Sequence, residues 1–129
     1  MRVLLDTHAF LWWTTRNGAL LSDRARDLLA DGETQVAFSI VSAWEIAIKA
    51  GAGRLELPLP ADQYVPDRLR KHGFELLAID LAHALHAGSL PRIHADPFDR
   101  MLVAQAQVEG IPLITADPAI GRYDVEVIW

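Results

Sequence analysis

Cysteine is absent from this chain of 129 residues, so disulfide bonds and thiolate-bound metals are excluded and a reducing compartment is expected. Long apolar runs are also absent, and none approaches the roughly 18–20 residues needed to cross a membrane. The first apolar run meets an acid at Asp6, which is too early for a secretory signal peptide. These absences predict a cytoplasmic protein with no membrane association.

Positive charge is scarce as well. The chain has 12 Lys and Arg residues against 17 Asp and Glu, and its formal net charge is −5. Proteins that bind nucleic acid through a basic surface usually carry a net positive charge. A nucleic-acid-binding role would therefore depend on local charge, on bound cations or on a basic partner. A phosphate-binding glycine loop, a dinucleotide fingerprint and a Ser-His-Asp arrangement are also missing.

Hydrophobic residues make up 51% of the chain, which suits one globular domain spanning residues 1–129. Short apolar runs alternate with helical segments along the whole length. We expect strands at 3–5, 35–39, 74–79, 111–115 and, as an edge strand, 125–129, with helices at 9–15, 23–31, 40–50, 61–72, 81–87 and 97–109. This alternation predicts an α/β fold with a parallel sheet of about five strands, covered by helices on both faces.

The segment from His94 to Ala106 contains a helix start with two acids in it. Asp96 precedes Pro97, and proline is favoured at the first helical position, which makes Asp96 the N-cap. Asp99 follows the cap by three residues. It is either the acid of a capping box or a carboxylate that points into a cleft at the helix N-terminus.

Asp6 and Asp117 each follow an expected strand. Either acid can serve as a local cap, or it can belong to a site at the carboxyl ends of the strands, where open α/β sheets bind ligands. For the helix that follows Asp6, we expect Thr7 to be the cap.

Glu45 lies within the helix expected at 40–50, whose apolar residues cover every face and predict a sandwiched helix. A buried carboxylate without a partner would cost several kcal/mol, roughly 3 or more, or would take up a proton. Glu45 therefore either forms an ion pair with Lys49, four residues further on, or faces the same cleft as Asp6, where a cation compensates its charge.

Acids gathered at one sheet edge repel one another and raise each other's pKa, so they stay ionised only beside a compensating cation. Without cysteine or a clear histidine set, the expected ion is the hard divalent Mg²⁺ or Mn²⁺. Such an ion activates a bound water and turns an acidic pocket into a site for phosphate oxygens. The pattern therefore predicts hydrolysis of phosphodiester bonds.

Large aromatic residues are concentrated near the start of the chain and in the segment 40–50. Core packing is their ordinary role, and binding of a partner protein is the alternative. The set comprises Phe10, Trp12, Trp13 and Trp44, and we expect those of them that are exposed to bind a partner.

Four blocks of sequence, in this order and at these separations, resemble the PIN-domain family, and within it the VapC-type toxins of bacterial toxin–antitoxin pairs. The resemblance covers essentially the whole chain. The blocks are Leu4-Leu5-Asp6-Thr7-His8, Ser39-x-x-Ser42-x-Trp44-Glu45-Ile46 with Lys49 and Gly53-Arg54-Leu55, Asp96-Pro97-Phe98-Asp99-Arg100-x-Leu102-x-Ala104-Gln105-Ala106, and Leu113-Ile114-Thr115-x-Asp117.

The resemblance implies a three-layer α/β/α fold and metal-dependent endoribonuclease activity on RNA. It implies that Asp6 and Asp99 are the principal ligands of Mg²⁺ or Mn²⁺, in an acidic site completed by Glu45 and Asp117. The fourth acidic position varies most in such proteins, so we also keep three auxiliary candidates: Asp96, Thr7 and Thr115. The resemblance further implies a homodimer, or a higher toxin–antitoxin assembly, inhibited by an antitoxin segment that packs near the acids.

Two other functions fit parts of the sequence. A phosphoacceptor receiver domain has a similar length, alternation and acidic Mg²⁺ pocket. It requires a lysine after the last core strand, however, and the only lysines here are Lys49 and Lys71. A PIN-like module that binds RNA or protein without cutting has the fold but not the activity. The intact acids favour the nuclease.

Overall fold

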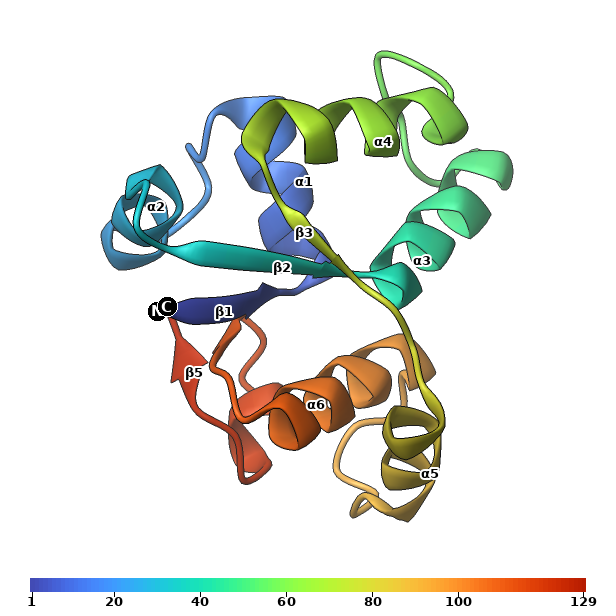
Figure 1. The fold of residues 1–129 in the computed structure, drawn as a ribbon. Helices are drawn as coiled ribbons and strands as arrows, with labels where there is room; N and C mark the ends of the chain where they lie inside the picture. Colours follow the sequence, from blue (N-terminus) through green and yellow to red (C-terminus); the bar gives the residue numbers. More distant parts are fainter.

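A computed structural model describes residues 1–129. Its centre is a five-stranded sheet with the strand order β3-β2-β1-β4-β5, in which every neighbouring pair is parallel (Figure 1). The strands are β1 (Arg2–Leu5), β2 (Gln35–Ser39), β3 (Glu75–Leu77), β4 (Leu113–Ile114) and β5 (Val127–Ile128). The expected parallel sheet and the edge position of the C-terminal strand are confirmed.

Helices cover both faces of this sheet and complete the expected three layers (Figure 1). The first layer holds α1 (Thr7–Arg16), α2 (Asp23–Ala30), α3 (Ile40–Gly51) and α4 (Ala61–His72). The second holds α5 (Leu81–Ser89), α6 (Pro97–Glu109) and the short 3₁₀ helix η1 (Ile120–Arg122). None of these helices is both long enough and apolar enough to cross a membrane.

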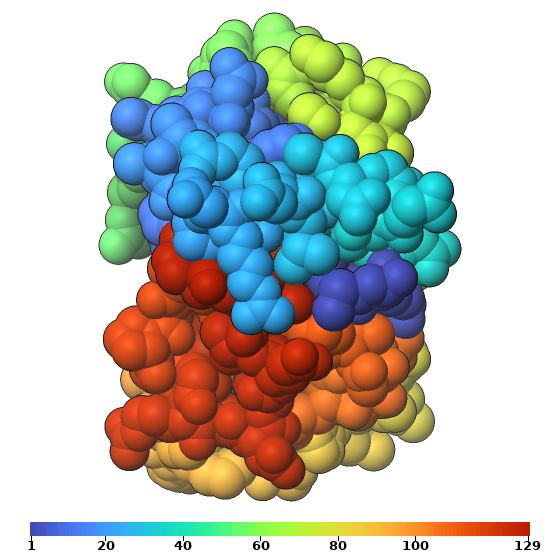
Figure 2. Space-filling view, turned by 90° about the vertical axis from the view of Figure 1, so that its left-hand side faces the viewer, coloured from blue at the N-terminus to red at the C-terminus, as the bar shows by residue number.

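The sequence itself is divided between the layers. Figure 2 shows the first half of the chain, in blue to green, on one side of the molecule and most of the second half, in orange to red, on the other. Successive residues of β1 alternate in the same way: Val3 and Leu5 enter one buried cluster, and Leu4 enters the other. The strand is covered on both faces, which explains why its sequence is continuously apolar.

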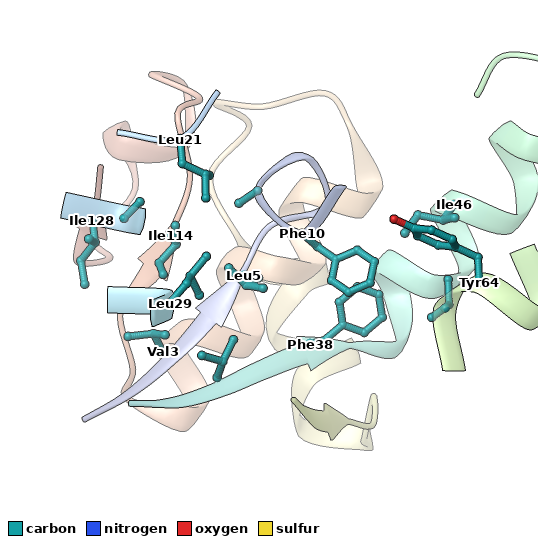
Figure 3. Close-up of a cluster of buried hydrophobic side chains, with 14 residues drawn as sticks. Val3, Leu5, Phe10, Leu21, Leu29, Phe38, Ile46, Tyr64, Ile114 and Ile128 are labelled. Carbon is teal, nitrogen blue, oxygen red and sulfur yellow. The ribbon is translucent and has the colours of Figure 1, made fainter. Parts of the chain in front are cut away.

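Aromatic packing joins the first helical layer to the sheet. Figure 3 shows the ring of Phe10 from α1 against that of Phe38 from β2, with ring centroids 4.3 Å apart. Tyr64 from α4 is fully buried, and its hydroxyl donates to Thr14 Oγ1 at 2.7 Å. Phe10 is therefore a core residue and not one of the partner-binding aromatics.

The expected sandwiching of α3 is wrong. Ile40, Trp44 and Ile48 lie four residues apart along one side of this helix and are 39%, 60% and 42% exposed. Only the opposite side of α3 reaches the core, through Val41 and Ile46. The helix begins directly after β2. Its exposed apolar residues show that no further layer covers its outer face.

The expected cap of α1 is also wrong. The helix includes Thr7, and Asp6 is the N-cap, with its carboxylate accepting from the backbone N–H of Ala9 at 2.7 Å. The Thr7 hydroxyl is not available for capping because it donates to Glu45. Asp6 therefore takes the capping role expected for Thr7, and Thr7 holds Glu45.

Replacing Phe10 by alanine should lower the free energy of unfolding by about 3–5 kcal/mol, because the ring is fully buried and its loss leaves a cavity between α1 and β2. Urea denaturation followed by circular dichroism measures this change. Leu20, which is 48% exposed, provides the control, and Leu20→Ala should lower the stability by less than about 1 kcal/mol. Equal losses in the two variants would contradict the packing.

Candidate functional site

The carboxyl ends of β1 and β4 lie side by side, with Leu5 paired to Ile114. Asp6 continues β1, and its backbone N–H donates to the carbonyl oxygen of Ile114 at 3.1 Å. Thr115 and Asp117 continue β4. The parallel register therefore brings acids from opposite ends of the sequence to one edge of the sheet, as expected.

Thr115 links the two acids at this edge. Its hydroxyl oxygen accepts from the backbone N–H of Asp117 at 3.1 Å, and its side chain hydrogen-bonds to the Asp6 carboxylate. Burial raises the pKa of Asp6, and the hydrogen bonds from Thr115 and Ala9 offset only part of that rise. Asp6 is therefore a helix cap and also a buried acid beside the strand ends.

Glu45 enters the same region from α3 and is 2% exposed. Thr7 Oγ1 lies 2.6 Å from Glu45 Oε1 and 2.9 Å from the Ser42 hydroxyl. Because a carboxylate only accepts, Thr7 donates to Glu45 and Ser42 donates to Thr7. The other carboxylate oxygen forms an ion pair with Lys49, yet the charge of Glu45 still acts on Asp6. Glu45 therefore forms the ion pair with Lys49 and also lies near enough to Asp6 for its charge to act there.

Asp99 lies in the first turn of α6, and its side chain is 19% exposed. Its pKa is raised to about 7, mainly by burial and then by the negative charges of Asp96, Glu45 and Asp6, with His94 acting in the opposite direction. These interactions place Asp6, Glu45 and Asp99 in one electrostatic environment. The first turn of a helix already favours a negative charge, so burial and the neighbouring acids together outweigh that effect on the pKa of Asp99.

Asp96, the first auxiliary candidate, is the N-cap of α6. Its carboxylate accepts from the backbone N–H of Phe98 at 2.9 Å, so its capping role is confirmed. Its charge is the largest electrostatic contribution to the raised pKa of Asp99. Asp96 therefore borders the acidic cluster while serving the helix.

His94 belongs to this cluster, although the sequence analysis did not single it out. Its Nε2 lies 3.2 Å from Asp99 Oδ2 and 2.8 Å from Asp117 Oδ2. Burial alone would raise the pKa of Asp117, but hydrogen bonds from His94 and the Ala119 backbone outweigh it and lower that pKa. His94 lies in an irregular loop, where no periodicity shows which way a side chain points; its one signal is its place two residues before Asp96.

The donor set fits a hard divalent cation. Potential ligand atoms of His94, Asp99 and Asp117 all lie within 4.8 Å of one another, and the charges of Asp6 and Glu45 act on Asp99. Carboxylate oxygens are the ligands that Mg²⁺ and Mn²⁺ prefer. Burial and the neighbouring acids together raise the pKa of Asp99, and His94 offsets only part of that rise.

A second group of potential metal-binding side chains is already hydrogen-bonded within the protein: Asp80, His83 and Glu109. His83 and Asp80 form a capping box at the start of α5, and His83 Nε2 lies 3.0 Å from Glu109 Oε2. Glu109 also forms an ion pair with Arg2 at 3.2 Å. This network joins α5, α6 and β1, and its role is structural.

A groove of about 730 Å³ opens beside the acids, between α1, α3 and the segment that follows α3. Thr7, the residue that holds Glu45, forms part of its lining. The lining also includes the positive side chains of Arg16, Lys49 and Arg54 and the ring of Trp12. Local positive charge therefore exists next to the site despite the net charge of −5.

Two curated relatives are similar to this chain. Ribonuclease VapC16 of Mycobacterium tuberculosis is 41% identical over 64 residues, which are 50% of this chain and 45% of that protein. Ribonuclease VapC22 of the same organism is 29% identical over 116 residues, which are 89% of this chain and 86% of that protein. The match to VapC16 thus spans less than half of that relative, whereas the match to VapC22 spans most of it.

The fold is similar to that of one chain in a toxin–antitoxin complex from Klebsiella pneumoniae, with a TM-score of 0.67 and 19% sequence identity. The superposition covers 98% of this chain and 96% of that one. At this identity the likeness concerns the fold alone. A family profile for the PIN domain matches residues 3–126, a range that includes every acid of the site from Asp6 to Asp117. This chain therefore belongs to the PIN-domain family.

Proposed function

We propose that this chain is a cytoplasmic toxin of a toxin–antitoxin pair, a single-domain endoribonuclease spanning residues 1–129 that depends on Mg²⁺ or Mn²⁺. The observation that carries the proposal is the grouping of Asp99 with Asp117 and His94, whose potential ligand atoms lie within 4.8 Å of one another, together with the pKa of Asp99, which burial and then the charges of Asp96, Glu45 and Asp6 raise to about 7. The similarity to ribonucleases named VapC supports RNA as the substrate.

Asp6 and Asp99 are the principal ligands in this proposal, and Glu45 and Asp117 complete the acidic site. A bound divalent cation would supply a Lewis acid for activating water and for stabilising charge on phosphate oxygens. Burial supports these roles, because a site with little water strengthens the attraction between carboxylates and a cation. The crowded acids would lose their mutual repulsion when such a cation binds.

Polar residues around the acids fix their directions. Thr7 donates to one oxygen of Glu45, which leaves the carboxylate little freedom to turn away from the site. Thr115 accepts from the backbone N–H of Asp117 and hydrogen-bonds to the side chain of Asp6, so it lies between the two acids. In this proposal Thr7 and Thr115 are auxiliary residues that orient the acids.

The groove beside Thr7 provides a path for the RNA strand. Arg16, Lys49 and Arg54 can contact phosphates on either side of the cleaved bond, because these side chains carry positive charge along the lining. Trp12 offers a flat face on which an unpaired base can stack. An antitoxin segment that occupies this groove would exclude RNA and inhibit cleavage.

Homodimer formation is the proposed resting assembly of the toxin. Leu81 and Leu85 are 73% and 67% exposed and lie one turn apart on α5. Leu76, on the edge strand β3, is 53% exposed. Three large apolar side chains exposed on β3 and α5 favour an interface in which a second copy of the chain buries them. Trp44, which is 60% exposed and packs edge-on against Phe98, is the aromatic that we assign to partner binding.

Asp99→Asn should reduce Mn²⁺-dependent cleavage of a labelled cellular RNA pool by about 100-fold or more, because a principal ligand and its charge are lost. Asp62→Asn, at an exposed position on α4, is the matched control and should cleave like the wild type. Equal cutting by all three proteins would contradict the site. RNA binding without cutting by antitoxin-free wild type would instead identify a non-cleaving module.

Without metal, the contribution of Asp99 to stability should fall as pH rises from about 4 to about 7. The folded protein keeps the Asp99 proton up to a pKa of about 7, whereas an unfolded aspartate releases it near ~3.9, so deprotonation favours unfolding in this window. Asp99→Asn should therefore be more stable than the wild type near neutral pH. After allowance for solvent exposure and for the lost helix-dipole interaction, we expect a gain of about 1–2 kcal/mol.

Thermal melts of wild type and Asp99→Asn across this pH range measure the effect. The difference between the two melting temperatures should widen as pH rises. A difference that is independent of pH would show that Asp99 titrates normally, and a less stable Asp99→Asn at neutral pH would argue against crowded acids.

Replacing both Leu81 and Leu85 by glutamate should convert a dimer into a monomer, because burying the added charges in an apolar interface is costly. Size-exclusion chromatography with light scattering gives the mass directly. Gln63→Glu, on the exposed side of α4, should leave the mass unchanged. A monomeric wild type at the same concentration would contradict the proposed dimer.

A further inference from the structure

His94 bridges two acids that come from different elements. Its Nε2 lies 2.8 Å from Asp117 Oδ2, which follows β4, and 3.2 Å from Asp99 Oδ2, in the first turn of α6. The His94 side chain is only 18% exposed. A single ring nitrogen therefore ties the start of a helix to the end of a strand inside the acidic site.

The backbone determines which nitrogen of His94 carries the proton. The N–H of Asp96 donates to His94 Nδ1 at 3.1 Å. A ring nitrogen that accepts a hydrogen bond carries no proton, so the neutral imidazole has its proton on Nε2. This N–H donates to Asp117 Oδ2, and Asp99 Oδ2 lies 3.2 Å from the same nitrogen. In this state Nε2 is a hydrogen-bond donor and cannot itself be a metal ligand.

The loop that carries His94 is held by a buried tyrosine. The hydroxyl of Tyr123 accepts from the backbone N–H of His94 at 2.9 Å and lies 3.0 Å from the carbonyl oxygen of Pro91, to which it donates. Tyr123 is 6% exposed and packs in the core of the second layer. The position of the His94 backbone is therefore set by the core and not by the flexibility of a surface loop.

Arg100 holds the same loop from α6. Its guanidinium donates to the carbonyl oxygens of Ala87, Leu90 and Pro91 at distances between 2.9 and 3.2 Å. These carbonyls lie at the end of α5 and at the start of the loop that follows it. Arg100 is one residue after Asp99, so the helix that carries the acid also fixes the loop that carries its histidine.

We propose that His94 is a positioning residue of the acidic site, held in place by Tyr123 and Arg100. Its Nε2–H donates to Asp117 Oδ2 and lies beside Asp99 Oδ2, so it holds these two side chains together. The Ala119 backbone N–H donates to the other oxygen of Asp117, and the second oxygen of Asp99 would be available to a divalent cation. The inference rests on the proposed function, because the acids that His94 orients are the ones assigned to the cation. Hydrogen-bonding partners of metal-binding carboxylates typically contribute about 10–100-fold to metal affinity.

Mn²⁺ binding to the full chain, measured by isothermal titration calorimetry without RNA, tests this role directly. His94→Ala should raise the Kd for Mn²⁺ by about 10-fold or more. His94→Gln should stay within about threefold of the wild type, because its amide places a donor near the position of Nε2. His86→Ala, which removes a histidine on α5 that bonds to Gln107, is the matched control and should leave the Kd unchanged.

Cleavage at increasing Mn²⁺ concentration separates positioning of ligands from a general loss of structure. His94→Ala should require more Mn²⁺ than the wild type and should approach wild-type cleavage at saturation. Tyr123→Phe keeps the buried ring but removes the hydroxyl that holds the loop, and we expect a smaller shift in the same direction. This second variant keeps the test decisive where His94→Ala folds poorly.

An unchanged Mn²⁺ affinity in His94→Ala would overturn the positioning role, and so would a His94→Gln that binds as weakly as His94→Ala. In both cases the loss of Mn²⁺ binding by Asp99→Asn would leave the proposed function intact. A wild type that binds no Mn²⁺ would overturn the proposed function itself. The two failures are therefore distinguishable in one series of titrations.

Discussion

Repulsion between carboxylates at the carboxyl edge of the sheet is the constraint on which the rest of this site depends. The parallel pairing of β1 with β4 places Asp6 beside Thr115, and α6 begins at the same edge with Asp99 in its first turn. The acids could be kept apart only by changing the register or the helix direction. The fold instead holds them together, and burial raises the pKa of Asp6 and of Asp99.

Neighbouring groups relieve this repulsion only in part. Lys49 pairs with one oxygen of Glu45 and Thr7 donates to the other, while His94 donates to Asp117 and lies 3.2 Å from Asp99 Oδ2. None of these contacts neutralises Asp99, whose pKa remains at about 7. A site that stays short of positive charge is less stable alone and more receptive to a cation. In this protein the same imbalance that weakens the fold supports the proposed chemistry.

Local sequence patterns predicted the elements well, because each pattern has a local physical cause. The helix from Pro97 to Glu109 follows from an Asp-Pro start and a glycine stop, and the strand from Gln35 to Ser39 follows from its apolar run. The exposure of the outer face of α3 could not be predicted in this way. Its apolar residues indicate that burial would be favourable, but they do not indicate whether another layer is present to bury them. Trp44 therefore remains 60% exposed.

The candidate site was predicted from its acids and missed its histidine for a comparable reason. Asp6, Asp99 and Asp117 mark strand ends or a helix start, so the topology alone brings them together. The use of Thr7 as a donor and not as a cap depends on Glu45, which is distant in sequence. His94 depends on the Tyr123 hydroxyl and on a backbone N–H, and no sequence pattern encodes those contacts.

The most direct measurement is a titration of the Asp99 carboxyl group by ¹³C NMR, with and without Mg²⁺. Without the cation we expect a pKa near the value of about 7 that follows from burial and crowding, and with Mg²⁺ we expect a clear fall. An ordinary aspartate pKa that Mg²⁺ does not change would contradict both the crowded acids and the cation site.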